Sequence, residues 1–102
     1  PPEIKNAKNV YWMYSILVED DFGLTRDDLR KHLARRGIET RTFFIPIHMQ
    51  PIYHKKYRER FLVAEELCRK GLYLPSGANL GKKEIKYIAE CVKSVKKRAK
   101  RL

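Results

Sequence analysis

The key segment of the sequence is Glu39-Thr-Arg-Thr-Phe-Phe-Ile-Pro-Ile-His-Met-Gln-Pro-Ile-Tyr53, which sets an arginine, two adjacent phenylalanines, a histidine and a glutamine around two prolines. Thr40 to Ile45 is rich in β-branched and aromatic residues, so it predicts a strand. Pro46 ends that strand because proline has no N–H to donate to a neighbouring strand. The pattern indicates a stiff loop that carries binding groups on a rigid scaffold. A buried strand followed by an ordinary surface loop fits it equally well.

A strand and a helix are expected before this segment. The run Val10-Tyr-Trp-Met-Tyr-Ser-Ile-Leu-Val18 is apolar with little alternation, which predicts a strand covered on both faces. Thr25-Arg-Asp-Asp28 fits a capping box, so we expect a helix from Arg26. Gly37 would end this helix in the left-handed conformation. Its buried stripe would consist of Leu29, Leu33 and Ala34.

Two more helices and a short strand are expected after the segment. The first helix covers Val63 to Lys70, the strand covers Leu72 to Pro75, and the last helix opens at Gly81. We expect the inward residues of the first helix to be Val63, Ala64, Leu67 and Cys68. Those of the last helix would be Ile85, Ile88, Ala89, Val92 and Val95. The order of elements predicts an α+β protein, a small α/β sandwich with helices on a mainly antiparallel sheet.

The composition is strongly basic. The 102 residues include 23 Lys and Arg against 12 Asp and Glu, a formal charge of +11. Such a surplus favours an anionic partner, which could be nucleic acid, an acidic membrane or a phosphorylated small molecule. Much of the surplus lies in 93–102, so the body of the domain is less basic. No apolar run reaches membrane-spanning length. Cys68 and Cys91 lie in helix-like segments without CxxC spacing, as reduced core cysteines do, so we expect a cytoplasmic protein.

The sequence contains no strong catalytic or metal-binding motif. His48 and His54 lack nearby cysteine or carboxylate ligands at the spacing of a tetrahedral metal site. Ser15, Ser76 and Ser94 lie outside any nucleophile elbow, and no glycine motif has the spacing of a phosphate-binding loop.

Three stretches, in this order and at this spacing, resemble the C-terminal part of the DegT/DnrJ/EryC1/StrS family of sugar aminotransferases, especially its perosamine synthase-like members. They are 9–18, 37–51 and 63–76, and the resemblance extends from about Val10 to Val95. The sequence departs from the family pattern at Thr42 and Leu62, where proline is common, and at Ile45, where tyrosine is common.

The resemblance implies the small domain of a pyridoxal-phosphate enzyme of aminotransferase fold type I that works as a homodimer. Such enzymes transfer an amino group, typically from glutamate, to a keto-sugar linked to a nucleotide. The lysine that forms the Schiff base with the cofactor would lie upstream, in a large domain, and none of the 13 lysines here matches its motif. We therefore expect the chain alone to bind no cofactor and to be inactive, and its start at Pro1 to be a cut inside a longer protein.

The resemblance also implies a role for the key segment, which would form part of the sugar pocket. The residues that match the motif are Arg41, Phe43, Phe44, His48 and Gln50. Arg41 would pair with a carboxylate or phosphate, the phenylalanines would line the pocket, and His48 and Gln50 would bind sugar hydroxyls or hold the loop backbone. The alternatives are an interdomain salt bridge for Arg41 and plain core packing for the phenylalanines. Tyr73 and Ser76 are further candidates on a neighbouring turn.

The expected organisation is a linker at 1–9, the aminotransferase small domain at 10–95 and a basic tail at 96–102. Two other functions stay open: a small basic nucleic-acid-binding domain, and a protein-interaction domain that reuses the fold. Nucleic-acid binding is the less favoured of these against the proposed enzyme, because lysine-rich helix ends are usually solvated surfaces. Loss of salt-sensitive heparin or duplex DNA binding on deletion of 96–102 would favour the first.

Overall fold

A three-stranded antiparallel sheet lies at the centre of the computed structural model, with the strand order β1-β3-β2. The structure describes residues 3–10, 12–54 and 60–101, the last six of these as backbone only. Its elements are β1 (Tyr14–Leu17), η1 (Asp20–Phe22), α1 (Arg26–Arg35), β2 (Arg41–Thr42), η2 (Ile47–Met49), α2 (Pro51–His54), α3 (Leu62–Lys70), β3 (Gly71–Leu74) and α4 (Lys82–Arg101). The predicted α+β class with an antiparallel sheet is confirmed.

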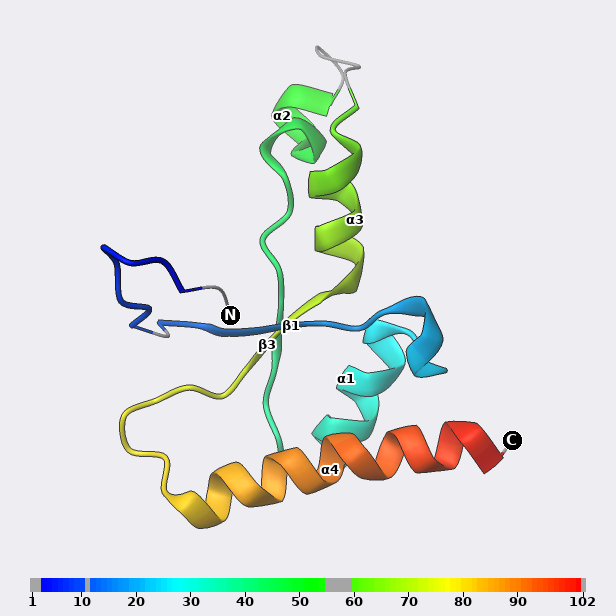
Figure 1. Cartoon of the computed structure of the whole chain (residues 1–102). Helices are drawn as coiled ribbons and strands as arrows, with labels where there is room; N and C mark the ends of the chain where they lie inside the picture. The colour runs from blue at the N-terminus through cyan, green and yellow to red at the C-terminus, as the bar shows by residue number, and fades with distance from the viewer. Residues whose placement is uncertain (1–2, 11, 55–59, 102) are drawn as a thin grey trace.

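One face of the sheet packs on α1 and α4, and this contact forms the core. Figure 1 shows these two helices together on one side of the sheet, while α2 and α3 extend away from it on the other. Leu72 is fully buried in the middle strand, between Ile16 of β1 and Thr42 of β2 in the register. The buried apolar residues are Val18, Leu29, Leu33, Ile38, Leu72, Cys91 and Val95.

The helix α1 forms as its local signals predict. The Thr25 hydroxyl accepts a hydrogen bond from the Asp28 amide at 3.2 Å, and Gly37 has φ +79° just after the helix. The prediction that Ala34 is buried is wrong, since it is exposed. The chain reverses after Gly37 and the Ile38 amide donates to the Leu33 carbonyl at 2.9 Å, so buried Ile38 fills the space beside Leu33 instead.

Two predicted strands are shorter in the structure. The expected strand from Val10 to Val18 is reduced to β1. Trp12 is 73% exposed, so the prediction that this strand is covered on both faces is wrong. Tyr11 lies outside the described residues. The strand expected from Thr40 to Ile45 is reduced to β2 plus one bond from the Phe43 amide to the Gly71 carbonyl. Pairing stops there because the partner strand begins at Gly71.

The apolar stripes of α3 and α4 are only partly buried. In α3, Val63, Ala64 and Leu67 are exposed and Cys68 is half-buried, because no described element covers this side of the helix. In α4, Ile88, Val92 and Val95 contact the core as predicted, whereas Ile85 and Ala89 are exposed. Buried Cys91 completes the α4 stripe, three residues after Ile88 and four before Val95, and both cysteines are free thiols.

Candidate functional site

The key segment and α3 together form a projection that we call the arm, residues 43–54 and 60–70. The chain leaves the sheet after β2, passes through η2 and α2, and returns along α3 to β3, as the green part of Figure 1 shows. Proline at both Pro46 and Pro51 keeps the outgoing segment out of a longer helix. All five predicted site residues lie on the arm or on the strand that leads into it.

The base of the arm is an aromatic group on the sheet face away from α1 and α4. The Phe43 ring stacks on Tyr73 with centroids 4.7 Å apart, and the Phe44 ring is tilted against Tyr73 at 5.7 Å. Phe44 is 66% exposed, so most of its ring faces solvent. Phe43 lies directly over Gly71, where a Cβ atom would overlap its ring. Close packing against the Phe43 ring therefore requires glycine at position 71.

Arg41 joins this aromatic group through the sheet register. It is the cross-strand partner of Tyr73, so the two side chains share a face. Its side chain is exposed and forms no ion pair with another described residue, which leaves the guanidinium free to bind an anionic group.

His48 lies at the far end of the arm, against α3. Its side chain is only 12% exposed, with Nε2 3.4 Å from Glu65 Oε2 and its ring edge-on to Phe61 at 4.8 Å. The Glu65 contact has ion-pair distance without the alignment of a hydrogen bond. The structure therefore shows His48 holding η2 against α3.

Glu65 is the centre of this outer cluster, and the sequence did not point to it. Its carboxylate accepts from Arg60 Nε at 2.9 and 3.0 Å and from the Phe61 amide at 3.1 Å, while Arg60 Nη2 lies at 2.7 Å. The Arg60 hydrogen bond is the main reason that the pKa of Glu65 is lowered, and Glu65 in turn raises the pKa of Arg60. The sequence gives no capping-box signal for it, because Phe61, which precedes α3, is neither serine nor threonine and Glu65 follows it by four residues.

Gln50 also makes its contact inside the arm. Its Nε2 donates to the Ile45 carbonyl at 3.2 Å and so closes the loop that contains Pro46. Ser76 is elsewhere, donating to the Trp12 carbonyl at 3.2 Å. The structure thus brings Arg41, Phe43 and Phe44 together with Tyr73 and places His48 and Gln50 in separate contacts farther along the arm.

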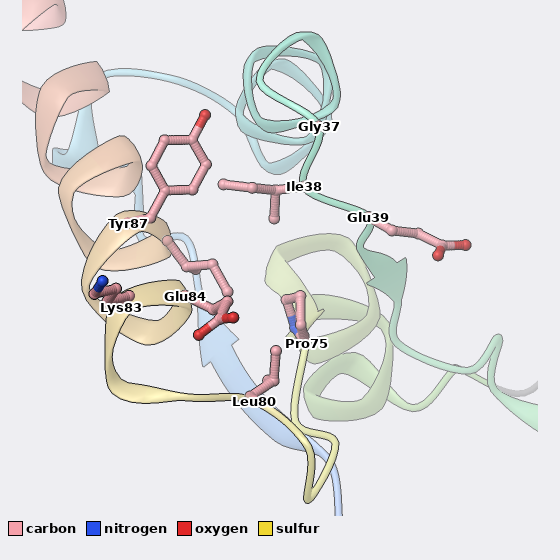
Figure 2. A pocket seen from close by; sticks show the side chains of 9 residues that line it. Gly37, Ile38, Glu39, Pro75, Leu80, Lys83, Glu84 and Tyr87 are labelled. Atoms are coloured by element: carbon pink, nitrogen blue, oxygen red, sulfur yellow. The ribbon is translucent and has the colours of Figure 1, made fainter.

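Two cavities among the described residues lie outside this site. Figure 2 shows one of about 490 Å³ between the α1–β2 connection, the β3–α4 connection and the first turns of α4. It is mainly apolar, and Tyr87 at its wall donates to the Arg36 carbonyl at 2.9 Å. A second cavity, of about 440 Å³ and with several charged side chains in its lining, lies beside η1 and the start of α1, next to Lys70. None of the five predicted site residues lines either cavity.

Metal binding and membrane insertion find no support in the described ranges. No group of three or more His, Cys, Asp or Glu side chains there could hold a metal ion. No helix within the same residues has the length and apolar character of a membrane span.

Comparison with known proteins identifies the family. A family model described as the DegT/DnrJ/EryC1/StrS aminotransferase family matches residues 1–93. The chain belongs to this family. The resemblance predicted from the three sequence stretches is confirmed.

The relatives of this family member are much longer. GDP-perosamine synthase of Escherichia coli O157:H7 is 40% identical over 90 residues, which are 88% of this chain and 24% of that protein. A putative pyridoxal phosphate-dependent aminotransferase, EpsN of Bacillus subtilis (strain 168), is 29% identical over 87 residues, 81% of this chain and 22% of that protein. The solved structure of DesV from S. venezuelae matches with a TM-score of 0.75 at 28% identity, over 100% of this chain and 26% of that one. The chain spans about a quarter of the curated relatives it matches, and its fold matches a small part of the fold type I aminotransferases.

The described side chains do not fit the covalent attachment of pyridoxal phosphate, the cofactor of the family's aminotransferases. Such attachment needs a lysine that is readily deprotonated in a desolvated setting. Lys70 is the only buried lysine among the described side chains, and carboxylates of Glu19, Glu66 and Asp20 surround its Nζ. These contacts, led by the hydrogen bond to Glu19, raise the pKa of Lys70 and keep it protonated. Lys70 therefore does not fit the role of the lysine that attaches the cofactor.

Proposed function

We propose that the chain is the C-terminal domain of a perosamine synthase-like aminotransferase and supplies a loop of its substrate pocket. The parent enzyme would use glutamate to aminate a 4-keto-6-deoxy sugar linked to a nucleotide, as a pyridoxal-phosphate-dependent homodimer. Its covalent lysine would belong to a large domain outside this chain. The 40% identity to a GDP-perosamine synthase is the observation that carries this proposal.

The arm supports the proposed role in the pocket. Its base presents an exposed arginine and an exposed phenylalanine on a rigid aromatic stack, which suits an anionic and partly apolar ligand such as a sugar nucleotide. In this proposal Arg41 binds a phosphate or carboxylate, and Phe43 and Phe44 form the pocket wall. His48 and Gln50 contribute mainly by fixing the loop, through Glu65 and the Ile45 carbonyl.

A chimaera tests the proposal directly. The matched 90 residues of the E. coli enzyme are replaced by this chain, and the formation of GDP-perosamine is measured. We expect an active, cofactor-loaded enzyme. Phe44→Ala and Arg41→Met should raise the KM for the sugar nucleotide or lower kcat without changing the absorbance of the bound cofactor.

The matched control is Ile4→Ala, because Ile4 is 69% exposed, close to the exposure of Phe44, but lies outside the arm. It should leave both kinetic constants unchanged. If the Phe44 and Arg41 variants of the chimaera are folded, cofactor-loaded and kinetically normal, the arm is not part of the pocket.

A further inference from the structure

The direction of α3, which forms half of the arm, is not set by an apolar core. Val63 is 72% exposed and Leu67 is also exposed, so the helix has no buried apolar stripe within the described chain. The only buried residue of α3 is Lys70, at its last turn. The contacts that orient the helix therefore lie at its junction with β3.

Arg26 binds the carbonyl groups at this junction. Its side chain is 15% exposed, and Nη1 donates to the Cys68 carbonyl at 2.5 Å and to the Gly71 carbonyl at 3.4 Å. The last carbonyls of a helix lack intrahelical donors and carry partial negative charge, so a guanidinium there is favourable. Arg26 begins α1, where its charge opposes the dipole of its own helix; its position is explained by α3 instead.

Lys70 binds the other side of the same junction. Its side chain is 10% exposed, and Nζ lies 2.9 Å from Glu19 Oε2, 3.0 Å from Glu66 Oε1 and 3.7 Å from Asp20 Oδ2. The Lys70 carbonyl accepts from the Val18 amide at 2.9 Å, which ties the junction to the end of β1. One lysine thus joins α3 to the segment that follows β1.

The junction also touches the base of the candidate pocket. The Gly71 carbonyl that accepts from Arg26 also accepts from the Phe43 amide at 3.4 Å, and the Phe43 ring lies over Gly71. At the other end of α3, Glu65 holds His48. A change in the direction of α3 would therefore move both ends of the arm.

We propose that Arg26 and Lys70 are positioning residues that fix the direction of α3 on the sheet and so place the arm at the substrate pocket. That these residues fix the direction of α3 follows from the contacts alone, whereas the placement of the arm at the substrate pocket rests on the proposed function. Ion pairs that are taken out of water often add little net stability, so their expected contribution is to geometry more than to the free energy of unfolding.

The test on this chain is the amide residual dipolar couplings of α3 compared with those of α1 and α4. We expect Lys70→Met and Arg26→Met to reduce the α3 couplings roughly twofold, because motion of a whole element is averaged in such data, while α1 and α4 keep theirs. Lys70→Arg should restore them. The matched control is Arg69→Met, whose side chain is 63% exposed and lies 3.7 Å from Asp20.

The outcomes separate this inference from the proposed function. Unchanged α3 couplings in both methionine variants overturn it, whatever the chimaera does. If the variants unfold, Glu19→Gln removes the carboxylate that joins Lys70 to the segment after β1, and unchanged α3 couplings in this milder variant also overturn it. In an active chimaera Lys70→Met should raise the KM on the order of tenfold with the cofactor absorbance intact, since a misplacement of about 1 Å can cost up to about 100-fold. An inactive wild-type chimaera would count against the proposed function and leave the coupling test in force.

Discussion

Replacing Gly71 by alanine should destabilise the protein through a single neighbour, the ring of Phe43. Gly71 has φ −81° and ψ 140°, an extended conformation that alanine adopts without strain. The added Cβ would nevertheless overlap ring atoms of Phe43 close to the backbone, where the side chain has little freedom to yield. The ring must leave its place on Tyr73, or β2 must move away from β3.

The change in unfolding free energy combines two destabilising contributions and one stabilising contribution. Displacing the ring forfeits a stacking contact worth about 0.5–1.5 kcal/mol, and residual overpacking costs about 1–3 kcal/mol. The alanine lowers the entropy of the unfolded chain, which stabilises the fold by about 0.4–1 kcal/mol. The free energy of unfolding should therefore fall by about 2 kcal/mol, which moves the urea midpoint by roughly 1 M.

The assay is urea unfolding followed by far-UV circular dichroism, with Gly77→Ala as the matched control. A Cβ at Gly77 would meet only the Asn79 side-chain oxygen, which can rotate away, so its effect should stay within about 0.5 kcal/mol. The decisive comparison is a double-mutant cycle. In a Phe43→Ala background, Gly71→Ala should be neutral or stabilising by up to about 1 kcal/mol. An equal cost of Gly71→Ala in both backgrounds would show that the Phe43 ring is not what the methyl group meets.

Three further predictions follow from other contacts. The pKa of Glu65 is lowered mainly by Arg60, so the stability that Glu65 contributes is present above the unfolded-state pKa near 4.5 and is lost as pH falls through the lower folded-state pKa. Amide exchange at the start of α3 should rise across that acidic window, and Arg60→Met should reduce this pH effect. Leu33→Ala should cost about 2–5 kcal/mol in unfolding free energy, whereas the same change at exposed Leu62 should cost almost nothing. Treatment with pyridoxal phosphate and borohydride should give no stoichiometric adduct on Lys70 by mass spectrometry, because the Lys70 amine stays protonated. Detection of such an adduct would show that Lys70 can act as the cofactor lysine.

The parts of the fold that the sequence predicted best depend on neighbours in the chain. The start of α1, its glycine end and the buried pair Leu29 and Leu33 rest on residues within one or two turns of each other. Likewise, the prediction of a strand before Pro46 was right in type but too long, because strand length depends on where the partner strand begins. The contacts of Arg26 and Lys70 could not be predicted, since they join residues 42 to 51 positions apart.

The mismatch between apolar pattern and exposure supports the proposed function. The sequence of α3 predicts an inward face at Val63 and Leu67, and the structure leaves both exposed. Leu17 of β1 is also exposed, and it is paired with Gly71, on the sheet face that carries Phe43 and Tyr73. An apolar pattern reflects burial in the complete assembly, whereas exposure here counts only the described residues, so these surfaces are where further protein would be expected to pack. In the proposed enzyme that protein would be the large domain.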